Sequence, residues 1–247
     1  MKHLMLFLAG LIAGFSAGAG EVRVAVAANF AGPMQQIAAE FEKESGHKAL
    51  LSSGATGKFY AQIVNGAPFD IFLAADDETP ARLEREGLAV AGVRYTYPVG
   101  RLVLWSAKPG VVDPAGAILA AGSFQRLAVA NPKTAPYGTA AVETLRALGL
   151  LERLQARFVQ GENIAQTHQF VASGNAEIGF VAVSQVFRDG ALAGGSAWIV
   201  PERLHAPIRQ DAALLARARN NPAAVALLAW LKSDRARAII RAAGYDT

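Results

Sequence analysis

The sequence predicts an α/β protein built of two lobes with a ligand cleft between them. Apolar strand-like runs alternate with helix-like runs almost to the end of the chain, and this alternation predicts parallel sheets with helices on both faces. Two irregular stretches that contain proline, 93–100 and 201–207, lie on either side of the middle third. Polar residues follow several strands, at the place where an α/β cleft collects its ligand contacts.

The first half of the chain predicts three strands, each followed by a helix. The run from Val22 to Ala28 is apolar throughout, as in strands that are buried on both faces. Met34, Ile37 and Phe41 then recur at helical spacing. In chain order, the predicted strands are 22–28, 48–52 and 70–75, and the predicted helices are 33–45, 56–65 and 80–86.

The second half repeats this alternation. Strands are predicted at 101–106, 127–130, 178–182 and 197–200, and helices at 138–148 and 163–172. Asn221-Pro222 opens a further helix, and Ser233 caps a last one that ends at Gly244.

The two irregular stretches divide the chain if both are hinge crossings. Residues 100–204 then form lobe 2, and residues 20–99 and 205–247 combine into lobe 1. Strand ends from both lobes would meet in the cleft between them.

The first nineteen residues have the features of a secretory signal peptide. Lys2 and His3 precede an apolar run over 4–15, and Ala17-Gly18-Ala19 fits a small-residue cleavage site. The alternative is a retained membrane anchor, but the run is shorter than the roughly 20 residues that a spanning helix needs. We expect export to the periplasm with cleavage near Ala19.

Composition excludes several classes of protein. The chain has no cysteine, so disulfides, thiolate catalysis and sulfur metal sites are absent. Its net charge is +4, from 24 basic and 20 acidic residues, and the basic residues are scattered rather than gathered into a nucleic-acid-binding patch. His47, His168 and His205 show no metal-ligand spacing.

No motif indicates catalysis. The stretch Gly54 to Lys58 is similar to a phosphate-binding P-loop, but that motif needs glycine at position 52 and serine or threonine at position 59. Ser52 and Phe59 stand there instead. No Gly-x-Ser-x-Gly elbow occurs. We therefore expect neither an enzyme nor a cofactor.

Four segments place hydrogen-bond donors at helix starts that follow strands. Asn29 would supply its side-chain amide and nearby backbone N–H groups, and Thr56 its hydroxyl and N–H. Tyr137 would supply a backbone amide, as would Ile164 behind the cap Asn163. The alternatives are that Asn29 and Thr56 are simple helix caps and that Tyr137 is a lid or surface residue. Together the four segments predict a receptacle for a small anion.

The expected donors also limit which anions the site can bind. Phosphate near neutral pH keeps a proton and needs an acceptor, whereas a donor-only site favours the fully ionised molybdate, tungstate, sulfate or chromate. Glu162 is the one carboxylate in the four segments. The sequence leaves open whether Glu162 or Lys58 faces the ligand.

Several stretches of the chain resemble the periplasmic molybdate-binding proteins of ABC importers, in the subgroup with Asn-Phe after the first strand. The similarity covers essentially the whole mature chain. The Gly-Ala-Pro-Phe-Asp segment that ends at Asp70 is a fairly specific mark of the family, and related binding proteins carry versions of it. The similarity is carried by 24–30, 53–58, 65–76, 128–132, 136–138 and 243–245.

The resemblance implies a type II periplasmic binding fold that closes on molybdate or tungstate without a metal counter-ion or a salt bridge. It implies a monomer that delivers this small inorganic oxyanion to a membrane permease and has no nucleic-acid partner. Position by position, it assigns oxyanion contacts to Ala28, Asn29, Thr56, Tyr137 and Ile164, the last four holding the molybdate oxyanion directly.

This chain departs from many members of that family. They have serine at the positions of Asn29 and Thr56, and some place a tyrosine hydroxyl where this chain has Ala182. Three alternatives therefore stay open: a receptor for sulfate or another tetrahedral oxyanion, an exported enzyme on the same fold, and an effector-sensing domain of a transcription regulator.

Overall fold

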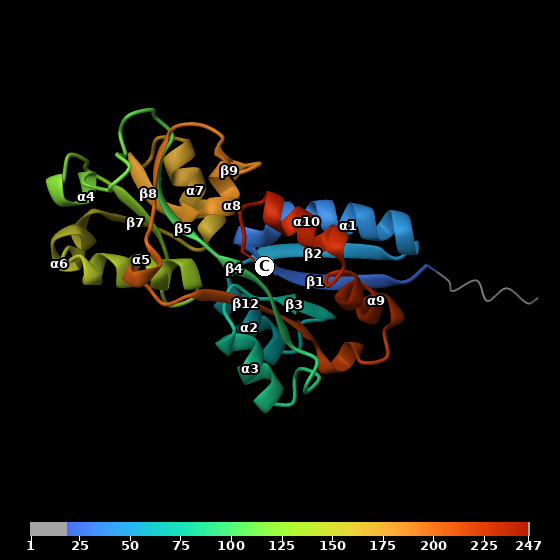
Figure 1. Ribbon diagram of the computed structural model, residues 1–247. Helices are drawn as coiled ribbons and strands as arrows, with labels where there is room; N and C mark the ends of the chain where they lie inside the picture. The colour runs from blue at the N-terminus through green and yellow to red at the C-terminus, as the bar shows by residue number, and fades with distance from the viewer. Residues whose placement is uncertain (1–18, 247) are drawn as a thin grey trace, which may run out of the picture.

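The computed structural model describes residues 19–246, and these form two five-stranded sheets joined by two chain crossings (Figure 1). The expected signal segment lies outside the described residues except for Ala19. Among the described residues, no helix is both long and apolar enough to cross a membrane.

The first sheet has the strand order β2-β1-β3-β12-β4. Its strands are β1 (Glu21–Ala27), β2 (Lys48–Gly54), β3 (Ile71–Leu73), β4 (Tyr95–Gly100) and β12 (Ile208–Leu214). The helices packed with it are η1 (Ala28–Phe30), α1 (Ala31–Ser45), α2 (Thr56–Val64), α3 (Glu78–Arg85), η4 (Ala216–Ala218), α9 (Pro222–Trp230) and α10 (Asp234–Ala242). We call this unit the first lobe.

The second sheet has the order β11-β5-β8-β6-β7. Its strands are β5 (Leu102–Ser106), β6 (Leu127–Ala130), β7 (Phe158–Gly161), β8 (Ile178–Ala182) and β11 (Ser196–Ile199). The other elements of this second lobe are α4 (Ile118–Ala121), α5 (Pro136–Ala147), α6 (Leu151–Leu154), η2 (Gln155–Arg157), α7 (Ile164–Ala172), α8 (Val183–Val186), the short strands β9 (Phe187–Arg188) and β10 (Ala191–Leu192), and η3 (Glu202–Leu204).

Each sheet is buried on both faces, as the apolar run in β1 predicts. Val22, Val24 and Val26 point into the core beneath α1 and α9, whereas Ala25 points into the core beneath α2 and α3. Figure 1 shows α1 and α10 on one side of the first sheet and α2 and α3 on the other. Burial of this kind, at about 25 cal/mol per Å² of apolar surface, is the main force that holds each lobe together.

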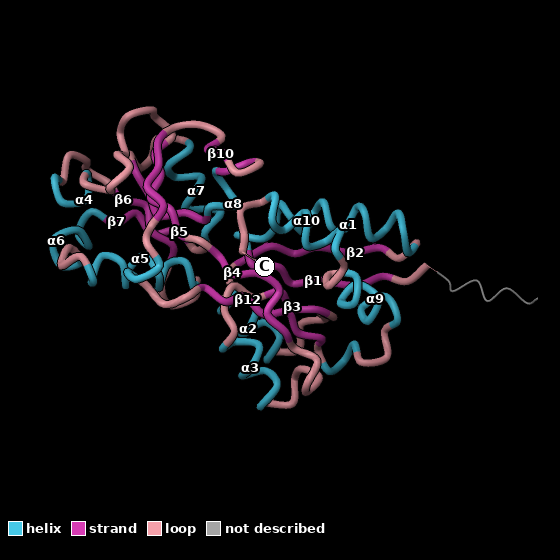
Figure 2. Tube along the Cα trace, viewed as in Figure 1, coloured by secondary structure: helices cyan, strands magenta, loops and turns pink. Residues whose placement is uncertain are grey.

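The prediction of parallel sheets is only partly right, because both sheets are mixed. Strand β12 runs antiparallel to β3 and β4, and β5 runs antiparallel to β8 and β11. The two stretches that the sequence analysis describes as irregular differ in the structure. The first, 93–100, contains strand β4, and the second, 201–207, ends directly before strand β12. These two strands lie side by side at the crossing between the lobes (Figure 2). The chain passes between the sheets from β4 to β5 and returns from β11 to β12.

Helix ends follow the expected capping chemistry. Asn163, Asn221 and Ser233 each accept hydrogen bonds from backbone N–H groups of the helix that they open. Gly46 ends α1 with a φ of 72°, a conformation that glycine adopts without strain.

Candidate oxyanion-binding site

A small cavity lies between the lobes, at the point where four helical segments begin. Its volume of about 10 Å³ is close to the space that one water molecule needs. No charged side chain is among the residues that line it: Ala27, Ala28, Asn29, Gly54, Ala55, Thr56, Ala75, Ala135, Pro136, Tyr137, Asn163 and Ile164. All five residues that the sequence assigns to the oxyanion are in this lining.

Thr56 is the first residue of α2 and is buried. Its hydroxyl accepts a hydrogen bond from the backbone N–H of Ala75 at 3.0 Å. A hydroxyl carries one proton and can accept as well as donate, so the proton of Thr56 stays available for a ligand. The backbone N–H of Thr56 has no partner within residues 19–246. Because Ala55 holds the cap position, Thr56 is not the cap of α2, and neither its hydroxyl proton nor its N–H has an acceptor among the described residues.

The side-chain amide of Asn29, which the sequence predicts as an anion donor, is bonded to other side chains of the protein. Its amide nitrogen donates to Oε1 of Gln210 at 2.8 Å and to Oη of Tyr245 at 2.9 Å. Both amide hydrogens are therefore used inside the protein. Of the two kinds of donor that the sequence predicts at Asn29, the side-chain amide and the backbone N–H, the backbone N–H is therefore the one left for an anion.

Tyr137 approaches the cavity from the second lobe through its main chain. Helix α5 begins at Pro136, which has no N–H, and the N–H of Tyr137 has no partner in the described part of the chain. The next residue, Gly138, allows α5 to begin this close to the end of β6, because a Cβ there would lie 2.2 Å from the carbonyl oxygen of Ala130.

Ile164 provides the second main-chain donor from this lobe. Asn163 caps α7 by accepting from Ala165 and Gln166 at 2.9 and 3.0 Å. These bonds leave the N–H of Ile164 without a partner among the described residues. The positive end of the dipole of α7 adds to the attraction for an anion at this point.

The two ionisable residues that the sequence left open, Lys58 and Glu162, pair with each other. Lys58 Nζ lies 2.6 Å from Glu162 Oε2, and this ion pair joins α2 of the first lobe to the turn before α7 of the second. Neither residue is among those that line the cavity. The pair is exposed, so it contributes little to stability, but it engages the one carboxylate of the four donor segments.

A second contact across the cleft involves the main chain alone. The N–H of Gly57 donates to the carbonyl oxygen of Thr134 at 2.9 Å. A Cβ on Gly57 would lie 3.0 Å from Cα of Thr134, so the two lobes meet here at the distance that a glycine allows. The two lobes are thus in direct contact beside the small cavity.

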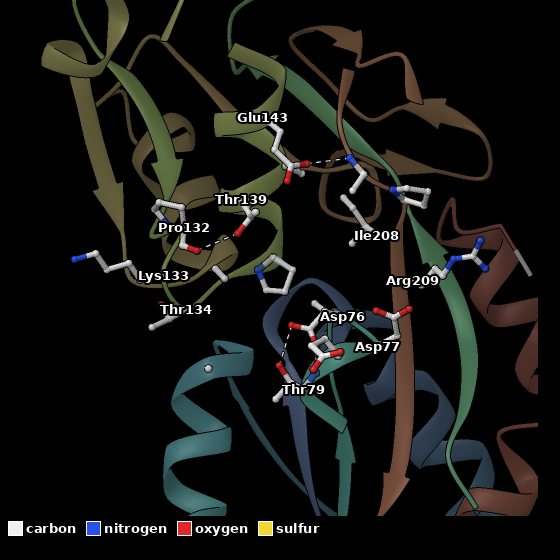
Figure 3. A pocket seen from close by; sticks show the side chains of 18 residues that line it. Asp76, Asp77, Thr79, Pro132, Lys133, Thr134, Thr139, Glu143, Ile208 and Arg209 are labelled. Carbon is white, nitrogen blue, oxygen red and sulfur yellow. Dashed lines mark hydrogen bonds between the residues drawn. The ribbon is translucent and has the colours of Figure 1, made fainter. Parts of the chain in front are cut away.

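A larger cavity of about 330 Å³ adjoins the small one between the lobes (Figure 3). Carboxylates of Asp76, Asp77 and Glu143 lie in its wall. Asp76 accepts hydrogen bonds from the N–H and hydroxyl of Thr79, while burial raises the pKa of its carboxyl group. The lining holds four acidic residues against the two basic residues Lys133 and Arg209. This excess of negative charge disfavours a dianion, so the small cavity without charged side chains is the candidate site.

Sequence reasoning missed three residues that lie directly behind the site: Ser184, Gln210 and Tyr245. Tyr245 stands in a stretch that carries the family resemblance, but nothing local to the sequence indicates that its hydroxyl reaches Asn29. His47, His168 and His205 do not line the small cavity, and the described residues hold no cluster of His, Cys, Asp or Glu suited to a metal ion.

The known proteins that are similar to this chain are solute-binding proteins. Residues 22–246 match the family described as bacterial extracellular solute-binding proteins. The chain is 60% identical over 237 residues to the molybdate-binding protein ModA of Azotobacter vinelandii, a match that covers 96% of this chain and 94% of that protein. It is 48% identical over 231 residues to the molybdate-binding protein ModA of Rhodobacter capsulatus, covering 94% and 90% of the two chains.

The fold of a solved structure agrees with these matches. The periplasmic molybdate-binding protein of Azotobacter vinelandii superimposes with a TM-score of 0.89 at 43% identity, over 92% of this chain and 99% of that one. Similarity at this level extends over both lobes.

Proposed function

This chain belongs to the bacterial extracellular solute-binding proteins, and from that membership and its site we propose that it captures molybdate, and with it tungstate, for an ABC importer. Its molybdate-binding relatives match it along nearly its whole length. The ligand is cargo, taken up by the closed lobes and passed to a membrane permease.

The observation that carries this proposal is the neutral cavity between the lobes. It is lined by helix starts from both lobes and by no charged side chain. The hydroxyl proton of Thr56 and the N–H groups of Thr56, Tyr137 and Ile164 have no acceptor among residues 19–246. Donors at helix starts bind anions without any counter-ion.

The energetics of such a site are sufficient. Each hydrogen bond to a charged group contributes roughly 1.5–3 kcal/mol, and micromolar affinity needs about 8 kcal/mol. Four to six such bonds would reach this value after the loss of translational freedom on binding. We assign them to Ala28, Asn29, Thr56, Tyr137 and Ile164, with Asn29 acting through its backbone.

The donor set favours a fully ionised oxyanion. A protonated phosphate would need an acceptor, and Glu162, the one carboxylate in the four donor segments, is bound to Lys58 instead. Sulfate shares the charge and tetrahedral shape of molybdate and is the alternative ligand. Molybdate and tungstate ions are nearly alike in size, so we propose that both bind.

The protein acts by binding rather than by catalysis or with a cofactor. The relatives are named for binding molybdate, and the residues that line the small cavity include no nucleophile paired with a base. We further propose a periplasmic monomer, exported with cleavage near Ala19, without a nucleic-acid partner. Closure brings the rims of both lobes into one arrangement, which is what a permease can recognise.

Thermal unfolding tests this function. We expect molybdate at 100 times its Kd to stabilise ligand-stripped protein by about 2.7 kcal/mol, a rise in Tm of roughly 5–10 °C for a chain of this size. Tungstate should act similarly, and sulfate and phosphate much less. Sodium chloride at equal ionic strength is the control. Stabilisation by sulfate with none by molybdate would contradict the proposal in favour of the alternative.

A further inference from the structure

Five buried polar side chains meet at the junction of the lobes, directly behind the small cavity. They belong to Asn29, Tyr137, Ser184, Gln210 and Tyr245, and none is more than 7% exposed. Three come from the first lobe, whereas Tyr137 and Ser184 come from the second. We call these five residues the junction cluster.

Tyr245 reaches this position through the end of the chain. Gly244 follows α10 with a φ of 82°, and a Cβ there would lie 2.8 Å from Cγ1 of Val183 in the second lobe. The Tyr245 ring packs edge-on against Phe30, with ring centroids 5.6 Å apart. Asp246 then pairs with Val99 of β4 through N–H···O bonds of 2.9 and 3.3 Å. The tail is thus anchored at the crossing between the lobes.

The Tyr245 hydroxyl joins both lobes. It accepts from Nδ2 of Asn29 at 2.9 Å, and its own proton can go to the carbonyl oxygen of Asn29 at 2.8 Å or to Oγ of Ser184 at 3.0 Å. Ser184 Oγ in turn donates to the same Asn29 carbonyl at 2.9 Å. A carbonyl oxygen has two lone pairs, so it can accept both bonds.

Gln210 links Asn29 to Tyr137, whose backbone N–H is one of the main-chain donors of the site. Its Oε1 accepts from Asn29 and its Nε2 donates to Oη of Tyr137 at 3.3 Å. A Cβ on Gly100 would lie 2.2 Å from that Tyr137 oxygen and 2.5 Å from Nε2 of Gln210. Glycine at 100 therefore gives these two side chains the space to meet.

We propose that Tyr245 is a positioning residue for oxyanion binding, because its hydroxyl holds Asn29 of the first lobe against Ser184 of the second. This inference rests on the proposed function. Asn29 and Tyr137 present their main chains to the cavity while their side chains lie in the junction cluster. The cluster is complete only when the lobes are closed, so its bonds favour the closed, ligand-holding state.

Burial supports this role. It raises the pKa of the Tyr245 phenol to about 12, so the hydroxyl keeps its proton across the physiological range. A buried polar cluster in which every member has a partner is rigid, and the loss of one member leaves others unsatisfied.

The test compares Tyr245→Phe with Tyr97→Phe. Tyr97 is a matched control, because it is equally buried and packs against the same Phe30 ring, with ring centroids 4.8 Å apart. Within the described part of the chain, however, its hydroxyl bonds only to the carbonyl of Ala74 in the first lobe. We expect Tyr245→Phe to raise the molybdate dissociation rate about tenfold with little change in association rate. Tyr97→Phe should leave both rates within about twofold, and the ligand-free Tm values of the two variants should be similar.

Ser184→Ala removes the hydroxyl of the second lobe that bonds to Tyr245. It tests the same junction independently, and it keeps the test decisive if Tyr245→Phe does not fold. We expect it to raise the dissociation rate as well, and the double variant to show less than the product of the two single effects. Dissociation no faster in Tyr245→Phe and Ser184→Ala than in Tyr97→Phe would overturn the inference. A wild-type protein that does not bind molybdate would instead overturn the proposed function.

Discussion

Replacing Thr56 with valine is expected to weaken molybdate binding by about 10- to 100-fold, the equivalent of one hydrogen bond to a charged group. Valine has nearly the shape of threonine but lacks the hydroxyl proton that faces the cavity. The same change leaves the buried N–H of Ala75 without its acceptor, so we also expect the free energy of unfolding to fall by about 1–3 kcal/mol. Titration calorimetry and thermal unfolding measure the two effects separately.

Two control variants separate binding from stability in this experiment. Thr56→Ser keeps the hydroxyl and should bind within a few-fold of the wild type. Ser233→Ala removes the cap of α10 at a residue that does not line the cavity, and should lower stability by about 1 kcal/mol without changing affinity. If Thr56→Val binds as tightly as Thr56→Ser, the hydroxyl is not a ligand of the oxyanion.

A leucine in place of Gly57 is expected to weaken molybdate binding by about 100-fold or more while the ligand-free protein stays as stable as before. A Cβ at this position already lies 3.0 Å from Cα of Thr134 in the other lobe, so a longer side chain holds the lobes apart. Gly57 lies in the first turn of α2 without a positive φ, and replacing a helical glycine stabilises a helix by up to about 1 kcal/mol. The affinity should therefore fall while the free energy of unfolding does not.

Gly32→Leu is the matched control for this wedge. Gly32 lies in the first turn of α1, and a Cβ there would meet no atom within 4 Å. We expect this variant to bind as the wild type does. Unchanged affinity in Gly57→Leu would mean that the closed arrangement of the lobes is not the state that holds the ligand.

The sequence predicts the local elements of this fold better than their pairing. An apolar run such as 22–28 identifies a buried strand because each face of it must meet a core. Strand β12 was missed because its middle contains Gln210 and Asp211, which are buried only by virtue of distant partners. Asp211 bonds to Arg94 and Thr96, more than a hundred residues away in the chain. Strand direction depends on such tertiary contacts and not on the pattern of one segment.

In the candidate site, too, the local elements can be predicted from the sequence, whereas the contacts between distant residues cannot. That four helix starts converge could be predicted, since the carboxyl ends of neighbouring parallel strands lie at one edge of a sheet. The direction of the Asn29 side chain could not, because its partners Gln210 and Tyr245 are 181 and 216 residues away. The pairing of Lys58 with Glu162 likewise depends on the closed lobes.

The central claim is that the neutral cavity binds molybdate, and isothermal titration of unfolded, stripped and refolded protein (residues 20–247) tests it most directly. The anions are molybdate, tungstate, sulfate and phosphate, each added to the same preparation. We predict micromolar or tighter binding of molybdate and tungstate, at one ion per chain, with sulfate at least a hundredfold weaker. Binding of sulfate or phosphate alone, or no heat from any of the four in a folded protein, would contradict the claim.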